Sequence, residues 1–273
     1  MTAALQKQSE AASVEERTRA FYDNEGWVAG ADGVIGENRY FRHDAKARGD
    51  YAAKVQAKAA QFFDGCHGNV LFAGPGDLPG NHMAVAARFA KVTCVDISEK
   101  SLAICADKLG AKAERHKASL LDLPLADNSV DAALCAHVLF HIDAREQARC
   151  VSELLRVVRP GGRIIIIYGN PEAPLMRIQR FLKSLGVNKL LKADQLYYFN
   201  HKLRWWDQFA DRATLTRLPY DMMSHRQERA LFPVAPLRRA VLRWTGRFED
   251  RAPARAAALW SYVAIRLDVN QDA

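Results

Sequence analysis

Residues 70–80 read VLFAGPGDLPG, an apolar run that changes abruptly into glycine and proline. Such a run predicts a buried strand ending in a tight turn, because glycine accepts backbone conformations that side chains exclude. A helix is expected next, over 82–90. Strand, glycine turn and helix N-terminus together predict a ligand-binding site, since the backbone can approach a ligand and the helix offers free N–H groups.

The same alternation of strand, turn and helix continues to residue 169. Helices are expected at 99–110 and 143–159, and further strands at 91–98, 113–119, 129–140 and 163–169. Continuously apolar strands that alternate with amphipathic helices predict a parallel sheet covered on both faces. With two more strands, at 213–221 and 259–269, we predict an α/β fold with a doubly wound, mostly parallel, seven-stranded sheet.

The composition argues against several classes of protein. No stretch approaches the roughly 20 apolar residues of a membrane span, and residues 1–20 lack the apolar centre of a secretory signal. The five cysteines are scattered without a CxxC pair, which argues against a disulfide framework or a zinc site. We therefore predict a cytoplasmic protein with no bound metal.

The positive charge is unevenly distributed. The net charge is +8, and residues 171–273 hold 18 lysines and arginines against 10 acidic residues, whereas the preceding part is balanced. A basic segment can face nucleic acid, a membrane surface or an anionic small molecule. It can also be a solvated surface of extended arginines.

Residues 1–64 are predicted to form a helical lid ahead of the domain that carries the sheet. An amphipathic helix is expected over 4–22, a loop follows it, and a second helix is expected over 49–64. The main domain is predicted over 65–273, with a cap insertion at about 175–210.

The predicted second strand ends in Asp96, 22 residues after Gly74. A carboxylate there can accept hydrogen bonds from both hydroxyls of a ribose, so Gly74, Gly76 and Asp96 predict a ribose-bearing cofactor. Alternatively, Asp96 only caps the next helix. The sixth position of the turn is Pro79, which departs from the GxGxxG pattern of a dinucleotide loop.

LRVVRPGG at 155–162 joins the long helix to the strand at 163–169. With the glycine turn and Asp96, this run resembles the class I S-adenosylmethionine-dependent methyltransferases, in particular the small-molecule branch related to ubiquinone methylases. The resemblance covers roughly residues 68–170. It implies transfer of a methyl group from S-adenosylmethionine to a small molecule, with nucleic acid an improbable partner and no membrane span.

The resemblance also implies a set of cofactor-binding residues. The glycine turn holds the methionine part, Asp96 the ribose and Ile97 the adenine, while the fourth strand passes beneath the sulfonium. The implied set is Tyr22, Ala73, Gly74, Gly76, Asp96, Ile97, Ser119, Leu120, Ala136 and His137.

Three residues depart from the family pattern. Phe72 replaces an acid, Leu78 replaces a third glycine, and Ser119 stands where an aspartate often accepts from the adenine amino group. A hydroxyl accepts more weakly than a carboxylate. We therefore expect modest cofactor affinity, or compensation by Asp77 and Asp122.

His141 is the candidate general base, four residues after His137, so that both are expected to face the cleft on one helical turn. The alternative is that His141 packs structurally. Tyr22 and Trp27 are expected to fold over the cofactor, where a ring can stabilise a sulfonium, or else to staple two helices together. Arg39, Tyr40 and Arg42 close the same lid or merely lie in solvent.

The run LYYFNHKLRWWDQFA at 196–210 is expected to cap the acceptor pocket. It suits an aromatic or amphipathic acceptor with a negative group; the alternative is that the tryptophans are core and the basic residues surface. The predicted substrate-binding residues are Trp27, Tyr198, His201, Arg204 and Trp205.

The sequence leaves several functions open. Oxygen is the preferred acceptor atom, with carbon or nitrogen next. Nucleic-acid methylation is suggested by the basic C-terminal part, but an NPPY-type tetrapeptide and an RNA-binding module are lacking. A non-catalytic cofactor-binding homologue and a nicotinamide-dependent reductase are the remaining alternatives.

Overall fold

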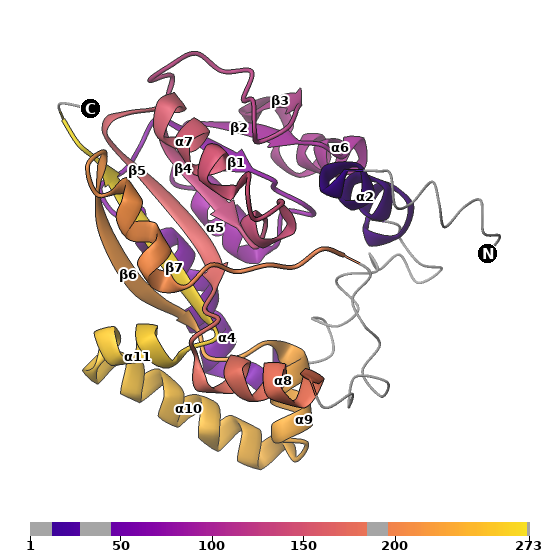
Figure 1. Cartoon of the computed structure of the whole chain (residues 1–273), viewed down its shortest axis with the longest axis vertical. Coiled ribbons are helices and arrows are strands. Elements are labelled where there is room, and N and C mark those ends of the chain that lie inside the picture. Colours follow the sequence, from indigo (N-terminus) through magenta and orange to yellow (C-terminus); the bar gives the residue numbers. More distant parts are fainter. Residues whose placement is uncertain (1–12, 28–44, 185–195, 272–273) are drawn as a thin grey trace.

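The computed structural model describes residues 13–27, 45–184 and 196–271. A seven-stranded sheet lies at its centre, in the order β3-β2-β1-β4-β5-β7-β6 (Figure 1). Strands β1 to β5 pair in parallel, and β7 is antiparallel to β5 and β6. This confirms the predicted α/β fold and its mostly parallel sheet. The strands are β1 Asn69–Ala73, β2 Lys91–Asp96, β3 Ala113–Lys117, β4 Val130–Ala136, β5 Val158–Gly169, β6 Ala213–Asp221 and β7 Tyr262–Val269.

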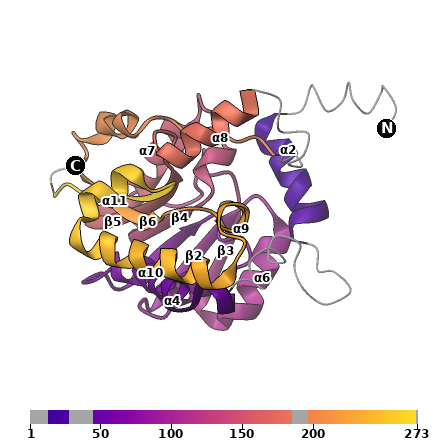
Figure 2. The ribbon, with the colours of Figure 1, turned by 90° about the horizontal axis from the view of Figure 1, so that it is seen from below.

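Helices cover both faces of this sheet (Figure 2). The longer ones are α2 Val14–Phe21, α4 Ala45–Gln61, α5 Gly80–Ala86, α6 Glu99–Leu109, α7 Gln147–Val157, α8 Pro174–Ser184, α9 His225–Leu231, α10 Ala235–Arg251 and α11 Pro253–Leu259. The short ones are η1 Tyr22–Gly26, η3 Gly110–Lys112, η4 Leu139–His141 and η6 Leu203–Phe209.

Alternate residues of β5 build the two halves of the core. Ile164 and Ile166 pack in the half that contains α7 and η6, while Ile165 and Ile167 pack in the half that contains α4, α5 and α10. All four isoleucines are fully buried. A strand covered on both faces must be apolar at every position, which is why RIIIIYG has no polar alternation.

The N-terminal elements differ in part from the predictions. Ser13 and Glu16 form a capping box that starts α2 at Val14, and residues 1–12 lie outside the described residues. The expected loop begins instead as a π-helix, η1 Tyr22–Gly26. Arg39, Tyr40 and Arg42 lie outside the described residues.

The RPGG run lies inside β5, although a turn ahead of the strand was predicted. β5 begins at Val158, and its register against β4 shifts between Val130 and Ala132. Gly161 takes a φ of +74° there. The extra residues form an irregularity in the strand, a feature that bends a strand without ending it.

Helix α4 belongs to the layer that covers the sheet. Its residues Tyr51, Val55 and Ala59 are buried in the core. The buried Lys58 donates to the Tyr220 carbonyl at 2.5 Å and pairs with Glu249 at 2.7 Å, which ties α4 to β6 and α10. Of the described residues before position 65, those of α2 and η1 lie over the site described below, and the division into a lid over 1–64 and a domain over 65–273 stays a prediction.

None of the helices in the described ranges is long and apolar enough to cross a membrane.

Candidate active site

The turn after β1 depends on two glycines in the left-handed region. Gly74 has a φ of +68° and Gly76 a φ of +57°. The Gly74 N–H donates to the Val95 carbonyl at 2.8 Å, which joins the ends of β1 and β2. A Cβ atom on Gly74 would lie 2.6 Å from a methyl of Val138. Backbone conformation and space therefore both require glycine at position 74.

Phe72 and Leu78, which depart from the family pattern, are core residues. Phe72 is fully buried, and its ring meets that of His82 edge to face at 5.4 Å between centroids. Leu78 has a φ of +51° and is also buried. It takes the conformation that a glycine would favour, at a cost of about 1–2 kcal/mol that its burial offsets. The turn keeps its shape through Gly74 and Gly76.

The carboxylate of Asp96 is held firmly at the end of β2. It accepts from the Ser98 N–H at 2.9 Å, from the Ser101 hydroxyl at 2.7 Å and from the Gly76 N–H. Burial raises the pKa of Asp96, and these hydrogen bonds oppose the rise. Because a carboxylate has about four acceptor positions, Asp96 retains capacity for a ligand hydroxyl.

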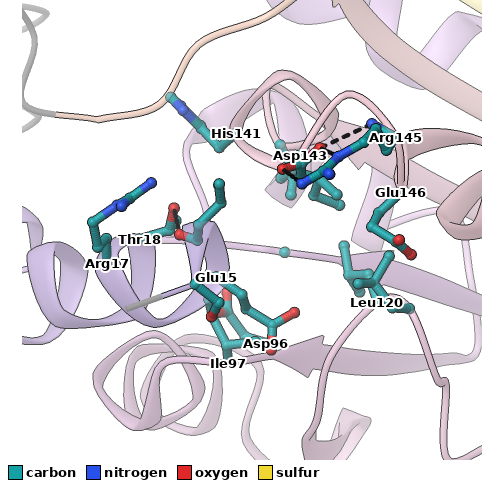
Figure 3. A pocket seen from close by; sticks show the side chains of 16 residues that line it. Glu15, Arg17, Thr18, Asp96, Ile97, Leu120, His141, Asp143, Arg145 and Glu146 are labelled. Carbon is teal, nitrogen blue, oxygen red and sulfur yellow. Dashed lines mark hydrogen bonds and ion pairs between the residues drawn. The ribbon is translucent and has the colours of Figure 1, made fainter. Parts of the chain in front are cut away.

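A cavity of about 450 Å³ lies between this strand end and α2 (Figure 3). Such a volume is in the range of ordinary small-molecule sites. The turn and the ends of β2 and β4 form one side, the loop after β3 another, and α2 a third. The lining residues are Ser13, Val14, Glu15, Arg17, Thr18, Gly74, Asp96, Ile97, Leu120, Leu121, Val138, His141, Ile142, Asp143, Arg145 and Glu146.

The segment from α2 to Trp27 is attached to the glycine turn and to the loop after β2. The Ser98 hydroxyl donates to Asp23 at 2.6 Å. The ring of Trp27 lies so close to Gly76 that a Cβ there would be 2.9 Å from it. Tyr22 stacks on Trp27 at 4.9 Å between centroids. These contacts hold residues 22–27 against the glycine turn and the loop after β2.

A carboxylate from α2 stands beside Ser119. The Ser119 hydroxyl donates to Glu15 at 2.5 Å and accepts from the Leu121 N–H at 3.1 Å. In Figure 3, Glu15 lies next to Asp96 and Ile97. The sequence SVEE at 13–16 indicates a helix start, but it gives no sign that this helix crosses the loop after β3.

His141 lines the cavity, and its hydrogen bond determines which of its two ring nitrogens carries the proton. Its Nδ1 lies 2.8 Å from the Tyr197 carbonyl oxygen. Since a carbonyl can only accept, Nδ1 carries the proton, and Nε2 of the neutral ring holds a lone pair. This is the tautomer that a general base requires at Nε2.

His137 points elsewhere, so the prediction that both histidines share one helical turn is wrong. His137 has a φ of +62°, and η4 begins two residues later. Its ring lies 5.2 Å from Tyr262 and 5.9 Å from Tyr220, and its N–H donates to the Ile167 carbonyl at 3.1 Å. The left-handed residue turns the chain between the two side chains.

The predicted cap residues separate into two groups. Tyr198 is 42% exposed, with its ring 6.1 Å from that of His141. His201 stacks flat on Trp205 at 4.4 Å and donates to the Ala144 carbonyl at 3.0 Å, which anchors residues 196–202. Arg204 is exposed on η6. Among the predicted substrate-binding residues of the cap, Tyr198 is the one beside His141.

The structure thus brings together part of the predicted set. Five predicted residues line the cavity: Gly74, Asp96, Ile97, Leu120 and His141. Others lie at strand ends or loops beside it: Tyr22, Trp27, Ala73, Gly76, Ser119 and Ala136. The lining residues that the sequence did not indicate are at the start of α2, after β3 and after β4: Ser13, Val14, Glu15, Arg17, Thr18, Leu121, Val138, Ile142, Asp143, Arg145 and Glu146.

The site also fits a nucleoside cofactor. Asp96 retains an acceptor position for a hydroxyl, and Ile97 and Leu120 offer apolar surface for a base. Within the described ranges, no three His, Cys, Asp or Glu side chains are grouped to hold a metal ion.

Comparison with known proteins agrees with this geometry. Residues 73–166 match the family model described as a methyltransferase domain. A demethylmenaquinone methyltransferase of Clavibacter sepedonicus is 31% identical over 153 residues, which cover 52% of this chain and 62% of the relative. The ubiquinone/menaquinone biosynthesis C-methyltransferase UbiE of Sinorhizobium fredii is 30% identical over 129 residues, 45% of this chain and 48% of the relative.

One similar solved structure extends the likeness over nearly the whole chain. The N-methyltransferase NodS from Bradyrhizobium japonicum WM9, in complex with S-adenosyl-L-homocysteine, superposes with a TM-score of 0.57 at 11% identity. The superposition covers 93% of this chain and 98% of that one, and at this identity it shows the fold. The curated relatives are matched over less than two thirds of their length. The family match and the fold together show that residues 73–166 are similar to the methyltransferase domain family.

Proposed function

We propose that this chain transfers a methyl group from S-adenosylmethionine to a small-molecule acceptor. The observation that carries the proposal is a single cavity that joins the glycine turn, Asp96 and His141. S-Adenosylmethionine supplies the electrophilic methyl group. The protein's part is to align the acceptor, exclude water and remove a proton, and alignment alone can contribute several kcal/mol to lowering the barrier.

Each end of the cofactor has matching residues in this proposal. Asp96 accepts from the ribose hydroxyls, Ile97 and Leu120 flank the adenine, and the turn from Ala73 through Gly76 holds the methionine part. Tyr22 and Trp27 lie over the turn and provide aromatic surface near a cationic sulfonium. Ala136, at the end of β4, lies beneath the same region.

We infer that Glu15 provides the carboxylate that Ser119 does not. Its contact with Ser119 places a charged acceptor at the outer edge of the apolar surface formed by Ile97 and Leu120. A charged acceptor binds an amino group about twice as strongly as a neutral one. In this proposal the adenine amino group is recognised by residues of both the loop after β3 and the helix α2.

His141 is the proposed general base. Its Nδ1 donates to the Tyr197 carbonyl, so Nε2 is the basic nitrogen of the neutral ring and the one proposed to take a proton from the acceptor. Tyr198 lies beside it and offers a ring and a hydroxyl to an aromatic acceptor. The stacking of His201 on Trp205 and its hydrogen bond to the Ala144 carbonyl anchor residues 196–202, which include Tyr198.

Carbon is the acceptor atom that we propose, in place of the oxygen preferred from the sequence. The support is the name of the S. fredii relative, a C-methyltransferase of ubiquinone and menaquinone biosynthesis. A phenol or enol becomes nucleophilic at its ring or α carbon once its hydroxyl proton is removed. The same base therefore serves carbon methylation of an aromatic or enolic acceptor.

Binding of S-adenosylhomocysteine and transfer of labelled methyl test the proposal separately. Isothermal titration should give binding by the full chain and loss of binding for Asp96→Ala, with the exposed Asp107→Ala as matched control. Labelled S-adenosylmethionine with a panel of phenolic and quinol acceptors should then label carbon, identified by mass spectrometry. Absence of binding by the wild type overturns the cofactor assignment; label on oxygen or nitrogen overturns the choice of carbon.

A further inference from the structure

The exposed apolar side chains of the described chain gather in its C-terminal part. The ten large apolar side chains that are exposed all lie between Ile178 and Leu259. The net positive charge of the chain comes from the same part, where residues 171–273 hold 18 basic against 10 acidic residues. Exposed apolar surface combined with one sign of charge indicates a contact surface.

Helix α8 has an apolar side that faces solvent. Ile178 is 56% exposed, Phe181 63% and Leu182 44%. Their spacing of three and four residues places them together on one side of the helix. Arg177 and Arg180 are exposed on the neighbouring side. This is the pattern of a helix that lies in the plane of a lipid interface.

The other side of α8 is occupied by α9. Gln227 of α9 donates to Gln179 at 2.8 Å and contacts the Met176 sulfur at 3.6 Å. These contacts join α8 to α9, while the apolar side of α8 remains exposed.

Helix α10 carries both paired acids and exposed arginines. Glu249 and Asp250 turn toward α4, where they pair with Lys58 at 2.7 Å and Lys54 at 2.5 Å. The exposed arginines recur every four residues, at Arg239, Arg243 and Arg247. Trp244, 60% exposed, stands between the last two in sequence. The buried Glu249 and the exposed Asp250 are thus both paired with lysines, while these arginines face solvent.

Figure 1 places α8, α9 and α10 at one end of the molecule, and Figure 2 shows α8 and α10 on different sides of that end. We call this the basic apolar end, defined by Ile178, Phe181 and Leu182 of α8 and by Arg239, Arg243, Trp244 and Arg247 of α10. α8 follows β5 directly, after Gly169, so this end adjoins the edge of the sheet at which the parallel strands finish.

We propose that the basic apolar end binds a lipid surface that carries anionic headgroups. Ile178, Phe181 and Leu182 enter the boundary between headgroups and acyl chains, and the arginines contact the headgroup phosphates. Each basic residue near an anionic membrane adds to the attraction, which salt screens. The inference does not depend on the methyl-transfer reaction, because it rests on surface residues outside the cavity.

The residue composition of the basic apolar end favours an anionic lipid surface over other kinds of partner. Single-stranded nucleic acid favours stacked aromatic rings in a basic groove, whereas two of the three exposed apolar residues of α8 are aliphatic. Apolar residues bordered by arginine suit an anionic lipid surface.

Flotation of the full chain with vesicles tests the proposal. We expect the wild type to float with vesicles of phosphatidylcholine mixed with phosphatidylglycerol and to remain unbound with phosphatidylcholine alone. High salt should weaken the binding. Phe181→Asp should reduce the bound fraction about tenfold, while Ala103→Asp, which adds the same charge at an exposed position of α6, should leave it within about twofold of the wild type.

Circular dichroism of each variant shows whether it is folded. The double variant Arg239→Gln with Arg243→Gln gives a second test, because it leaves the apolar side of α8 intact. This pair should weaken binding to anionic vesicles. The proposal is overturned if the wild type does not bind anionic vesicles, or if folded Phe181→Asp binds as well as the wild type. It is also overturned if Phe181→Asp instead dissociates a dimer, or if the arginine pair loses RNA binding without any vesicle binding.

Discussion

Ser119 of the loop after β3 donates its hydroxyl proton to Glu15 of helix α2, 104 residues earlier in the chain. This contact joins α2 to the loop after β3 at the cavity of the candidate site. Cofactor affinity should therefore depend on a lid residue as much as on the sheet.

Replacement of Glu15 tests that dependence. Glu15→Ala should weaken S-adenosylhomocysteine binding about tenfold to a hundredfold, because a hydrogen bond to a charged group contributes about 1.5–3 kcal/mol. Glu25→Ala, an exposed acid of the same lid, is the matched control. Isothermal titration gives both dissociation constants.

The double variant Glu15→Ala with Ser119→Asp sharpens the test. It returns one carboxylate to the same place and should recover most of the affinity, whereas Ser119→Asp alone should weaken binding, because two carboxylates then compete for one position. An unchanged dissociation constant for Glu15→Ala would show that Glu15 does not contact the cofactor.

Alanine substitutions at Gly74 and Gly65 distinguish the stability cost of backbone strain from the cost of steric crowding. Both have positive φ, but a Cβ on Gly65 meets nothing within 4 Å, whereas one on Gly74 meets Val138 at 2.6 Å. Gly65→Ala should lower the free energy of unfolding by about 1–2 kcal/mol through strain alone. Gly74→Ala should cost about 1–3 kcal/mol more, by crowding, and should abolish cofactor binding. Urea unfolding measures both; equal costs would contradict the crowding at Val138.

His141→Gln tests the general base. Turnover should fall by about 10²–10⁴-fold, the usual contribution of a positioned base. The dissociation constant for S-adenosylhomocysteine should change little, since Asp96 and the glycine turn remain. His116→Gln on β3 is the matched control, because this histidine pairs with Glu114 away from the cavity. A parallel loss of binding and turnover would assign His141 a structural role instead.

His82 makes the fold sensitive to acid. Burial lowers the pKa of His82 to about 3, while in the unfolded chain the imidazole has its ordinary value near 6.5. Below about pH 6.5 the unfolded chain binds a proton that the folded chain excludes, so stability falls as pH falls toward 3. The loss is about 1.4 kcal/mol per pH unit, or about 2 kcal/mol between pH 6.5 and 5.

His82→Leu should reduce this acid sensitivity. Within the described residues the Nε2 atom of His82 has no hydrogen-bond partner, so leucine removes an unsatisfied polar atom at similar volume. Urea unfolding at pH 8 and pH 5 compares the two proteins. If both lose the same stability at pH 5, the acid sensitivity comes from other groups.

Local sequence was sufficient to predict the sheet and half of the site. Glycines at 74 and 76 and an acid at 96 are each tied to a strand end, so their positions follow from the strand–turn–helix pattern. Helix ends were less predictable, since α7 begins at Gln147 rather than at 143. The side-chain directions of His137 and His141 differ because His137 takes a left-handed conformation that the spacing of the two histidines does not reveal.

The sequence by itself determined the order of strands and helices, the glycine turn and the position of Asp96, because apolar periodicity and glycine act within a few residues. Tertiary structure alone decided that Glu15 reaches Ser119, that the His141 proton is on Nδ1, and that the apolar side of α8 faces solvent. These three depend on contacts between segments far apart in the chain. Local propensity carries no information about such contacts, since packing and hydrogen bonding select them only when the whole core forms.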